Sequence, residues 1–95
     1  MVGSPDNIDE LNGLLLNSYV AYNNNGAEYV IELNESEMIQ INLVNSLGQT
    51  IDQKQVFVDG QTRIELPVSQ LSSGMYLIIS TKDGVLIDNQ KLFVR

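Results

Sequence analysis

Short apolar runs alternate with turn residues along most of the chain, at intervals of roughly 8–12 residues. The clearest example is Met38–Asn45, in which Ile39, Ile41 and Leu43 alternate with polar residues. A period of two places alternate side chains on opposite faces of a β-strand. No long stretch shows the spacing of an amphipathic helix. The pattern therefore predicts an all-β protein.

Turn residues divide this pattern into seven strands. Asp59-Gly60 and Asp83-Gly84 are typical of two-residue hairpin turns of type I′, which need positive φ. Seven short, mainly antiparallel strands indicate an immunoglobulin-like sandwich, and a partly open barrel is the structural alternative. The predicted strands are Leu14–Tyr22, Glu28–Leu33, Met38–Asn45, Gln49–Val58, Thr62–Val68, Met75–Thr81 and Val85–Val94.

The start of the chain differs from the rest because it is polar and acidic. We interpret residues 1–13 as a flexible linker, or a remnant added ahead of the domain, and residues 14–95 as one β-sandwich. The longest leucine run, Leu14-Leu15-Leu16, is much shorter than a membrane span. The first residues also lack the basic and apolar regions of a signal peptide. We expect no insertion into a membrane.

The amino-acid composition excludes several kinds of catalytic and metal-binding site. The chain has neither histidine nor cysteine, which removes serine triads, Cys–His pairs and the commonest metal ligand. Acidic residues outnumber basic ones by 12 to 5, and the net charge of −7 disfavours nucleic acid as a partner. We therefore predict that the protein is not an enzyme, binds no cofactor or metal and has no nucleic-acid partner.

An acidic cluster surrounds the second predicted strand and the turn after it, at Glu28, Glu32, Glu35 and Glu37. Two close carboxylates could act as acid and base or bind a hard cation. The alternative is a solvated acidic loop. We favour the loop, because no nearby residues supply the remaining ligands.

Basic residues collect at the end of the chain, where Lys82, Lys91 and Arg95 lie. Lys91 and Arg95 alternate with Leu92 and Val94, so the two pairs are predicted to lie on opposite faces of a strand. One interpretation is that positive charge protects an edge strand from aggregation, since an unprotected edge could self-associate. The other is a recognition tag.

The sequence Leu71-Ser-Ser-Gly-Met-Tyr76 has the composition of a corner that leads into a strand. A tyrosine at such a corner commonly buries its ring and donates its hydroxyl to nearby backbone. We interpret Gly74 and Tyr76 as structural residues.

Three segments, taken in order, resemble the type A C-terminal sorting domain of the bacterial type IX secretion system. Met38–Gln49 is similar to the family's alternating strand and its following turn, here at Leu47 and Gly48. Gly60–Ile78 is similar to a pattern of Gly, then Ile-x-Leu, then Leu-x-x-Gly-x-Tyr. Gln90-Lys-Leu-Phe-Val-Arg95 resembles the family's terminal Lys-Lys-Leu-x-x-Lys/Arg. The resemblance covers roughly residues 20–95.

Two positions depart from the family pattern. Tyr22-Asn-Asn-Asn-Gly26 stands where the family usually has Tyr-Pro-Asn-Pro, although Asn and Gly also tolerate positive φ and can form a turn. Gln90 replaces a lysine that is common in the family.

The resemblance implies a sorting signal that directs a cargo protein through the type IX outer-membrane translocon. The implied partners are this translocon, an outer-membrane carrier barrel and a surface sortase. The cargo is implied to pass through the periplasm and to be secreted or held at the cell surface, associated with the outer membrane. Cleavage of the signal, where it occurs, is implied to fall within Met1–Gly13.

Recognition is predicted to use the last strands, with Lys91, Leu92, Val94 and Arg95 as site residues. In this hypothesis the terminal strand adds to a partner's sheet, Leu92 and Val94 anchor it, and the two cations steer it toward acidic partners. The alternative hypothesis is a resident immunoglobulin-like surface module, used for adhesion, structural spacing or signalling.

Overall fold

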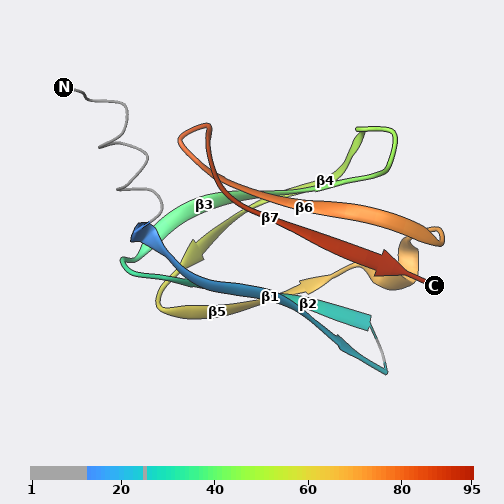
Figure 1. Ribbon diagram of the computed structural model, residues 1–95, viewed down its shortest axis with the longest axis horizontal. Coiled ribbons are helices and arrows are strands. Elements are labelled where there is room, and N and C mark those ends of the chain that lie inside the picture. Colours follow the sequence, from blue (N-terminus) through green and yellow to red (C-terminus); the bar gives the residue numbers. More distant parts are fainter. Residues whose placement is uncertain (1–12, 25) are drawn as a thin grey trace.

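Two antiparallel β-sheets pack face to face in the computed structural model, which describes residues 13–24 and 26–95 (Figure 1). Sheet A has the strand order β1-β2-β5, and sheet B has the order β4-β3-β6-β7. The all-β sandwich prediction is confirmed. The strands are β1 (Leu15–Asn23), β2 (Gly26–Leu33), β3 (Glu37–Val44), β4 (Thr50–Val58), β5 (Gln61–Leu66), β6 (Gly74–Lys82) and β7 (Val85–Val94).

The core lies between the sheets and is built from alternate residues of each strand. Tyr29 and Ile31 of β2 face Ile39 of β3, Ile78 of β6 and Leu92 of β7, and all five are at most 1% exposed. Full burial of one such side chain contributes about 1.5–3 kcal/mol. The period of two in the sequence is therefore the period of the core.

One predicted turn is wrong. Asp59-Gly60 does not close a hairpin, because β4 belongs to sheet B and β5 to sheet A. Gly60 has a φ of +68°, but Asp59 is not in the positive-φ region that a type I′ turn requires at both positions. The Gly60 carbonyl instead accepts a hydrogen bond from the Leu33 amide across 3.2 Å. The chain therefore crosses between the sheets here.

The other predicted hairpin is confirmed. Asp83 and Gly84 have φ values of 51° and 81°, and they join the paired residues Lys82 and Val85 of β6 and β7. The fifth strand is shorter than predicted: it ends at Leu66, before Pro67 and a short 3-10 helix, η1 (Val68–Gln70). Proline cannot donate a ladder hydrogen bond, which explains the earlier end.

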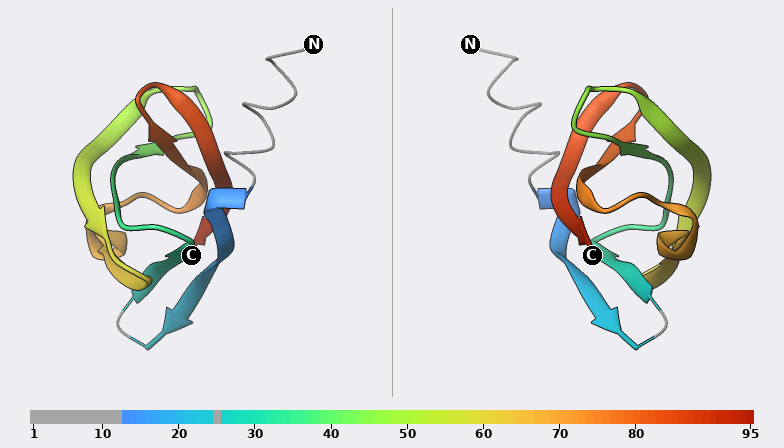
Figure 2. Two further views of the ribbon diagram at one scale, coloured as in Figure 1. Left: turned by 90° about the vertical axis from the view of Figure 1, so that its left-hand side faces the viewer. Right: turned by 90° about the vertical axis from the view of Figure 1, so that its right-hand side faces the viewer.

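The two sheets meet along one side of the sandwich, where β1 and β7 lie side by side (Figure 2). β1 is an edge of sheet A, and β7 is an edge of sheet B. The last strand therefore has a ladder partner, β6, on one side and the edge of the other sheet on its other side.

The predicted boundary at residue 14 remains a prediction, because residues 1–12 lie outside the described part of the chain. The predicted cleavage segment, Met1–Gly13, lies outside the described residues except for Gly13. Leu14 itself is 7% exposed in the core, and its carbonyl accepts a hydrogen bond from the Asn34 amide across 2.7 Å.

Candidate recognition strand

The end of β7 presents two different faces. Leu92 and Val94 are 0% and 8% exposed and belong to the core. Lys91, Phe93 and Arg95 are exposed on the other side, so the predicted separation of the two cations from Leu92 and Val94 is confirmed. The predicted anchoring of a partner's sheet by Leu92 and Val94 is not available in this fold, because the sandwich already covers both side chains.

The outer edge of β7 is partly occupied by β1. The Phe93 amide donates to the Tyr22 hydroxyl across 3.0 Å, and the Gln90 side-chain amide donates to Ser18 Oγ across 2.7 Å. In an antiparallel strand, residues two apart turn their backbone groups to the same side. A partner strand that added to β7 would therefore have to displace Tyr22 first. Side chains can be recognised at this strand without that displacement.

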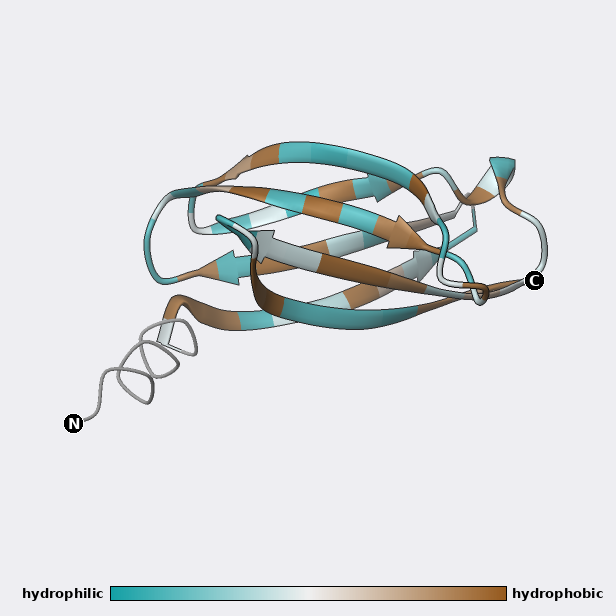
Figure 3. Ribbon diagram, turned by 90° about the horizontal axis from the view of Figure 1, so that it is seen from above, coloured by the Kyte–Doolittle hydropathy of each residue, from teal (hydrophilic) through white to brown (hydrophobic). Residues whose placement is uncertain are grey.

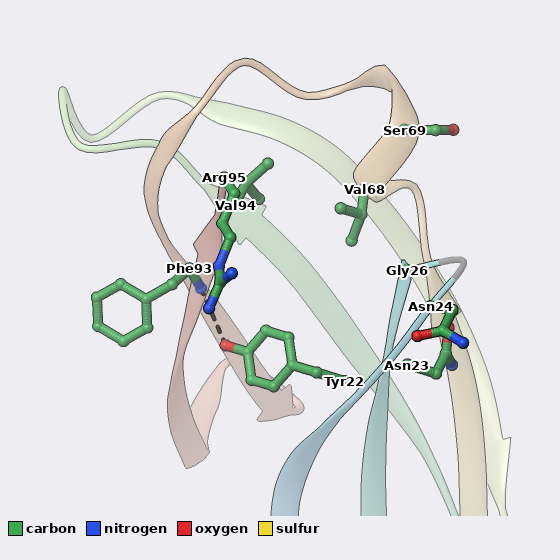
Figure 4. Close-up of a pocket in the computed structure, with 9 residues that line it drawn as sticks. All are labelled: Tyr22, Asn23, Asn24, Gly26, Val68, Ser69, Phe93, Val94 and Arg95. Atoms are coloured by element: carbon green, nitrogen blue, oxygen red, sulfur yellow. Dashed lines mark hydrogen bonds between the residues drawn. The ribbon is translucent and has the colours of Figure 1, made fainter.

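A pocket of about 570 Å³ lies where the end of β7 meets the turn between β1 and β2. Tyr22, Val68, Val94 and Arg95 line it, together with the backbone around Phe93 (Figure 4). The Phe93 ring points away from Val68 and Ser69 in this view. Residues 22–24 and Gly26 thus meet the end of β7 at one end of the sandwich, although the two segments are far apart in the sequence.

A buried polar bridge fixes β7 against the opposite sheet. The Tyr29 hydroxyl of β2 lies 2.8 Å from Ser80 Oγ of β6 and donates to Asp88 Oδ2 of β7 across 2.5 Å. Burial raises the pKa of the Tyr29 phenol far above its usual range, and the hydrogen bond to Asp88 adds to this shift. Ser80 pairs with Asp88 immediately before a register shift, so the bridge holds the position at which β7 resumes regular pairing.

The corner residues behave as predicted. Tyr76 is 7% exposed, and its hydroxyl donates to the Ser72 carbonyl across 2.6 Å. Gly74 pairs with Val94 at a φ of +146°, a conformation that side chains rarely adopt, while the space around its α-carbon is open. Gly74 is therefore required for backbone geometry and not for close packing. Both residues position the start of β6 beside the end of β7.

The turn between β3 and β4 carries the remaining motif residues, Leu47 and Gly48. The Asn45 side-chain oxygen accepts from the amides of Leu47 and Gln49, across 2.9 and 3.0 Å, and forms a compact Asx turn. Gly48 adopts a φ of +86°, and Leu47 is 81% exposed at the tip. The turn lies on β3 and β4, so the structure does not bring it to β7.

The acidic cluster does not form a cation site in the described residues 13–24 and 26–95, which contain no group of three or more potential metal ligands. Glu28 pairs with Arg63 at 3.2 Å, and Glu37 pairs with Lys82 at 3.6 Å. The Glu37–Lys82 pair also accounts for one of the three cations near the end of the chain. Lys91 and Arg95 have no such ion pair among the described residues.

Sequence reasoning missed two residues of this region, Phe93 and Tyr22. Phe93 is 58% exposed, although it is one of the two phenylalanines of the chain. Its position between Leu92 and Val94 in an alternating strand was the available signal. The Tyr22 contact joins residues 71 positions apart, and nothing local in the sequence indicates it.

The comparison with protein-family models decides the family. Residues 23–95 match the model of the secretion system C-terminal sorting domain. The chain belongs to this family. The sorting domain is therefore a C-terminal sorting signal for cargo of the type IX secretion system, and the resemblance read from the three sequence segments is confirmed.

Three conclusions about the cargo and the sorting domain follow from family membership. The cargo is a secreted protein, the sorting domain interacts with the type IX secretion system, and the family is one of sorting signals and not of enzymes. Family membership does not favour the alternative hypothesis of a resident surface module. A search of curated proteins found no match. None of the helices in the described residues has the length and apolar character needed to cross a membrane.

Proposed function

We propose that the type IX machinery recognises the sorting domain through the outward side chains at the end of β7, namely Lys91, Phe93 and Arg95. The observation that carries this proposal is the geometry of β7. Its inner residues are committed to the core, and its outer edge is engaged by Tyr22. The outward side chains remain for a partner to contact.

Charge supports the same site. The chain has a net charge of −7, and Lys91 and Arg95 are both exposed cations outside the ion pairs of the described residues. Opposite charge accelerates encounter and fixes the orientation of two proteins more than it adds affinity. An acidic receptor surface would thus meet this end of the sandwich first.

Leu92 and Val94 remain part of the proposed site as positioning residues. They hold β7 in the sheet and so determine where the outward side chains lie. Tyr76 and Gly74 act in the same way from β6, since Gly74 pairs with Val94 and Tyr76 pairs with Leu92.

The proposed partners are the outer-membrane translocon, a carrier barrel of the outer membrane and a surface sortase. The proposed destination of the cargo is the cell surface, in association with the outer membrane, after passage through the periplasm. The sorting domain has no catalytic role and no cofactor in this proposal. These points rest on family membership together with the exposed cations of β7.

Removal of charge tests the proposal. A fluorescent reporter that carries a signal peptide and residues 1–95 is expressed in a host with type IX secretion. The double variant Lys91→Gln/Arg95→Gln is expected to lower surface fluorescence about tenfold, the effect of losing about 1.4 kcal/mol of binding. The matched control is Lys54→Gln/Arg63→Gln, which removes the same charge from β4 and β5 and should export normally.

Two results would overturn this assignment: normal export of the β7 variant, or equal loss in both double variants. Equal loss would indicate that net charge matters and position does not. Urea unfolding of each purified chain checks that all variants are folded.

A further inference from the structure

The outer face of sheet B is unusual because it has apolar residues and no carboxylates. Met75, Leu77 and Ile79 of β6 alternate with the core residues Tyr76 and Ile78, so they point away from the core. Met75 is 39% exposed, and its direct cross-strand neighbour Phe93 is 58% exposed. Leu77 and Ile79 are half-buried, and Val44 of β3, which lies opposite Leu77 on the same face, is 9% exposed.

The pattern of β6 is that of a strand covered on both faces. β3 alternates apolar and polar residues, as expected for a strand with one solvated face. In β6, Leu77, Ile78 and Ile79 follow Met75 and Tyr76 as a run without polar side chains between them, and Figure 3 shows this run as a continuous brown stretch. Such continuous runs are typical of strands buried on both sides. The sandwich covers only the inner side.

The acidic residues of sheet B lie on its inner side. The strands of sheet B contain three acidic residues, Glu37, Asp52 and Asp88. Their cross-strand partners, which point toward the core, are Val58, Leu43 and Ser80 respectively. Lys91 pairs with Leu77 and therefore lies on the outward face. In a chain with 12 acidic residues, this face has a lysine and no carboxylate within its strands.

We propose that this outer face, formed by Val44, Met75, Leu77, Ile79, Lys91 and Phe93, is a docking surface for a protein of the secretion machinery. Its partner presents an apolar surface with a carboxylate opposite Lys91. The proposal rests on the proposed function and extends the site from the end of β7 across β6 to β3.

Charge complementarity selects this occupant. Exposed apolar patches mark interaction sites in soluble proteins, and a lysine within the patch selects a partner with negative charge. A second copy of the chain fits less well, because each copy has a net charge of −7 and the face supplies no carboxylate for the other copy's Lys91.

Site-specific photocrosslinking tests the surface with the face otherwise intact. A photoreactive phenylalanine analogue replaces Phe93 in the exported reporter, and a matched control replaces Tyr19, which is 38% exposed on sheet A. The expected result is a crosslink from position 93 to an envelope component of the secretion machinery, identified by mass spectrometry, and no such crosslink from position 19. A crosslink to a second copy, equal crosslinks from both positions, or no crosslink would overturn the proposal.

A substitution separates this proposal from the previous one. Leu77→Thr/Ile79→Thr places side chains of high β-propensity at both positions and keeps both terminal cations, but it removes apolar character from the outer side of β6. It is expected to lower both export and the crosslink from position 93 about tenfold. If that variant exports normally while Lys91→Gln/Arg95→Gln fails, the cations are recognised and the apolar face is not. The opposite pattern retains the face and rejects the cations. Should the double variant fail to fold, Met75→Ser repeats the test at an exposed position.

Discussion

The outer faces of the two sheets differ in their charged residues and in the exposure of their apolar residues. On sheet A, Glu28 and Glu65 lie opposite each other, and Arg63 pairs with Glu28 at 3.2 Å. Val30 of this face lies between Tyr19 and Arg63 and is 1% exposed, while Tyr19 is 38% exposed. The outer face of sheet A is thus charged, and its central apolar residue, Val30, is covered within the domain.

The outer face of sheet B has exposed apolar residues and no carboxylate within its strands. The outward residues Met75, Leu77 and Ile79 of the central strand β6 are apolar, and Met75 and Phe93 are exposed as a neighbouring pair. The inner faces of the two sheets, in contrast, share one core. The two sheets contribute equally to the core but differ toward solvent, and this difference is the reason for proposing recognition on sheet B.

The largest expected effects test the equivalence of the inner faces. Ile31→Ala in sheet A and Leu92→Ala in sheet B each remove a side chain that is 0% exposed. Each is expected to lower the free energy of unfolding by about 2–5 kcal/mol, through lost burial and an unfilled cavity. Urea unfolding measures both. A Leu92→Ala variant as stable as the unaltered chain would show that β7 is not part of the core.

A smaller effect tests the bridge between the sheets. Tyr29→Phe removes the hydroxyl that joins β2 to Ser80 and Asp88, and is expected to cost about 1–3 kcal/mol at neutral pH. Urea unfolding at pH 7 is the measurement. An unchanged unfolding midpoint would mean that water replaces the bridge without loss.

The bridge also predicts a dependence on alkaline pH. The pKa of Tyr29 is raised in the folded chain above its ordinary value of 10.0, so only the unfolded chain loses this proton as the pH passes 10. The contribution of Tyr29 to stability is therefore full below pH 10 and declines above it. The stability difference between the unaltered chain and Tyr29→Phe should shrink as the pH rises above 10. A constant difference would contradict the shift.

The smallest expected effect lies on the outer face of sheet A. Arg63→Gln breaks an ion pair whose side chains are 54% and 34% exposed, and such pairs contribute about 0–1 kcal/mol. Stability should change little in urea unfolding, and export of the reporter should not change. Loss of export would indicate that recognition uses sheet A instead of sheet B.

The local parts of the fold are readable from the sequence. Alternation in β3 and the Asp83-Gly84 turn follow from side-chain period and positive φ, and both are correct. The Asp59-Gly60 turn could not be predicted correctly, because the composition of a turn does not reveal whether the next strand joins the same sheet. The continuous apolar run of β6 was present in the sequence, but only the sheet register shows that it leaves an uncovered face.

The candidate site was predictable in part for the same reason. Alternation separates Lys91 and Arg95 from Leu92 and Val94, and the structure agrees. The engagement of β7 by Tyr22 could not be predicted, because it depends on how the edges of two sheets approach each other.

A single added negative charge on either outer face distinguishes sheet B from sheet A as the site of recognition. Asn89→Asp adds one negative charge beside Ile79 on sheet B, and Gln61→Glu adds one beside Glu32 on sheet A. Both residues are exposed and both changes preserve side-chain shape. Surface fluorescence of the reporter should fall several-fold for Asn89→Asp and stay unchanged for Gln61→Glu. Equal export of the two variants, or loss with Gln61→Glu alone, would contradict recognition on sheet B.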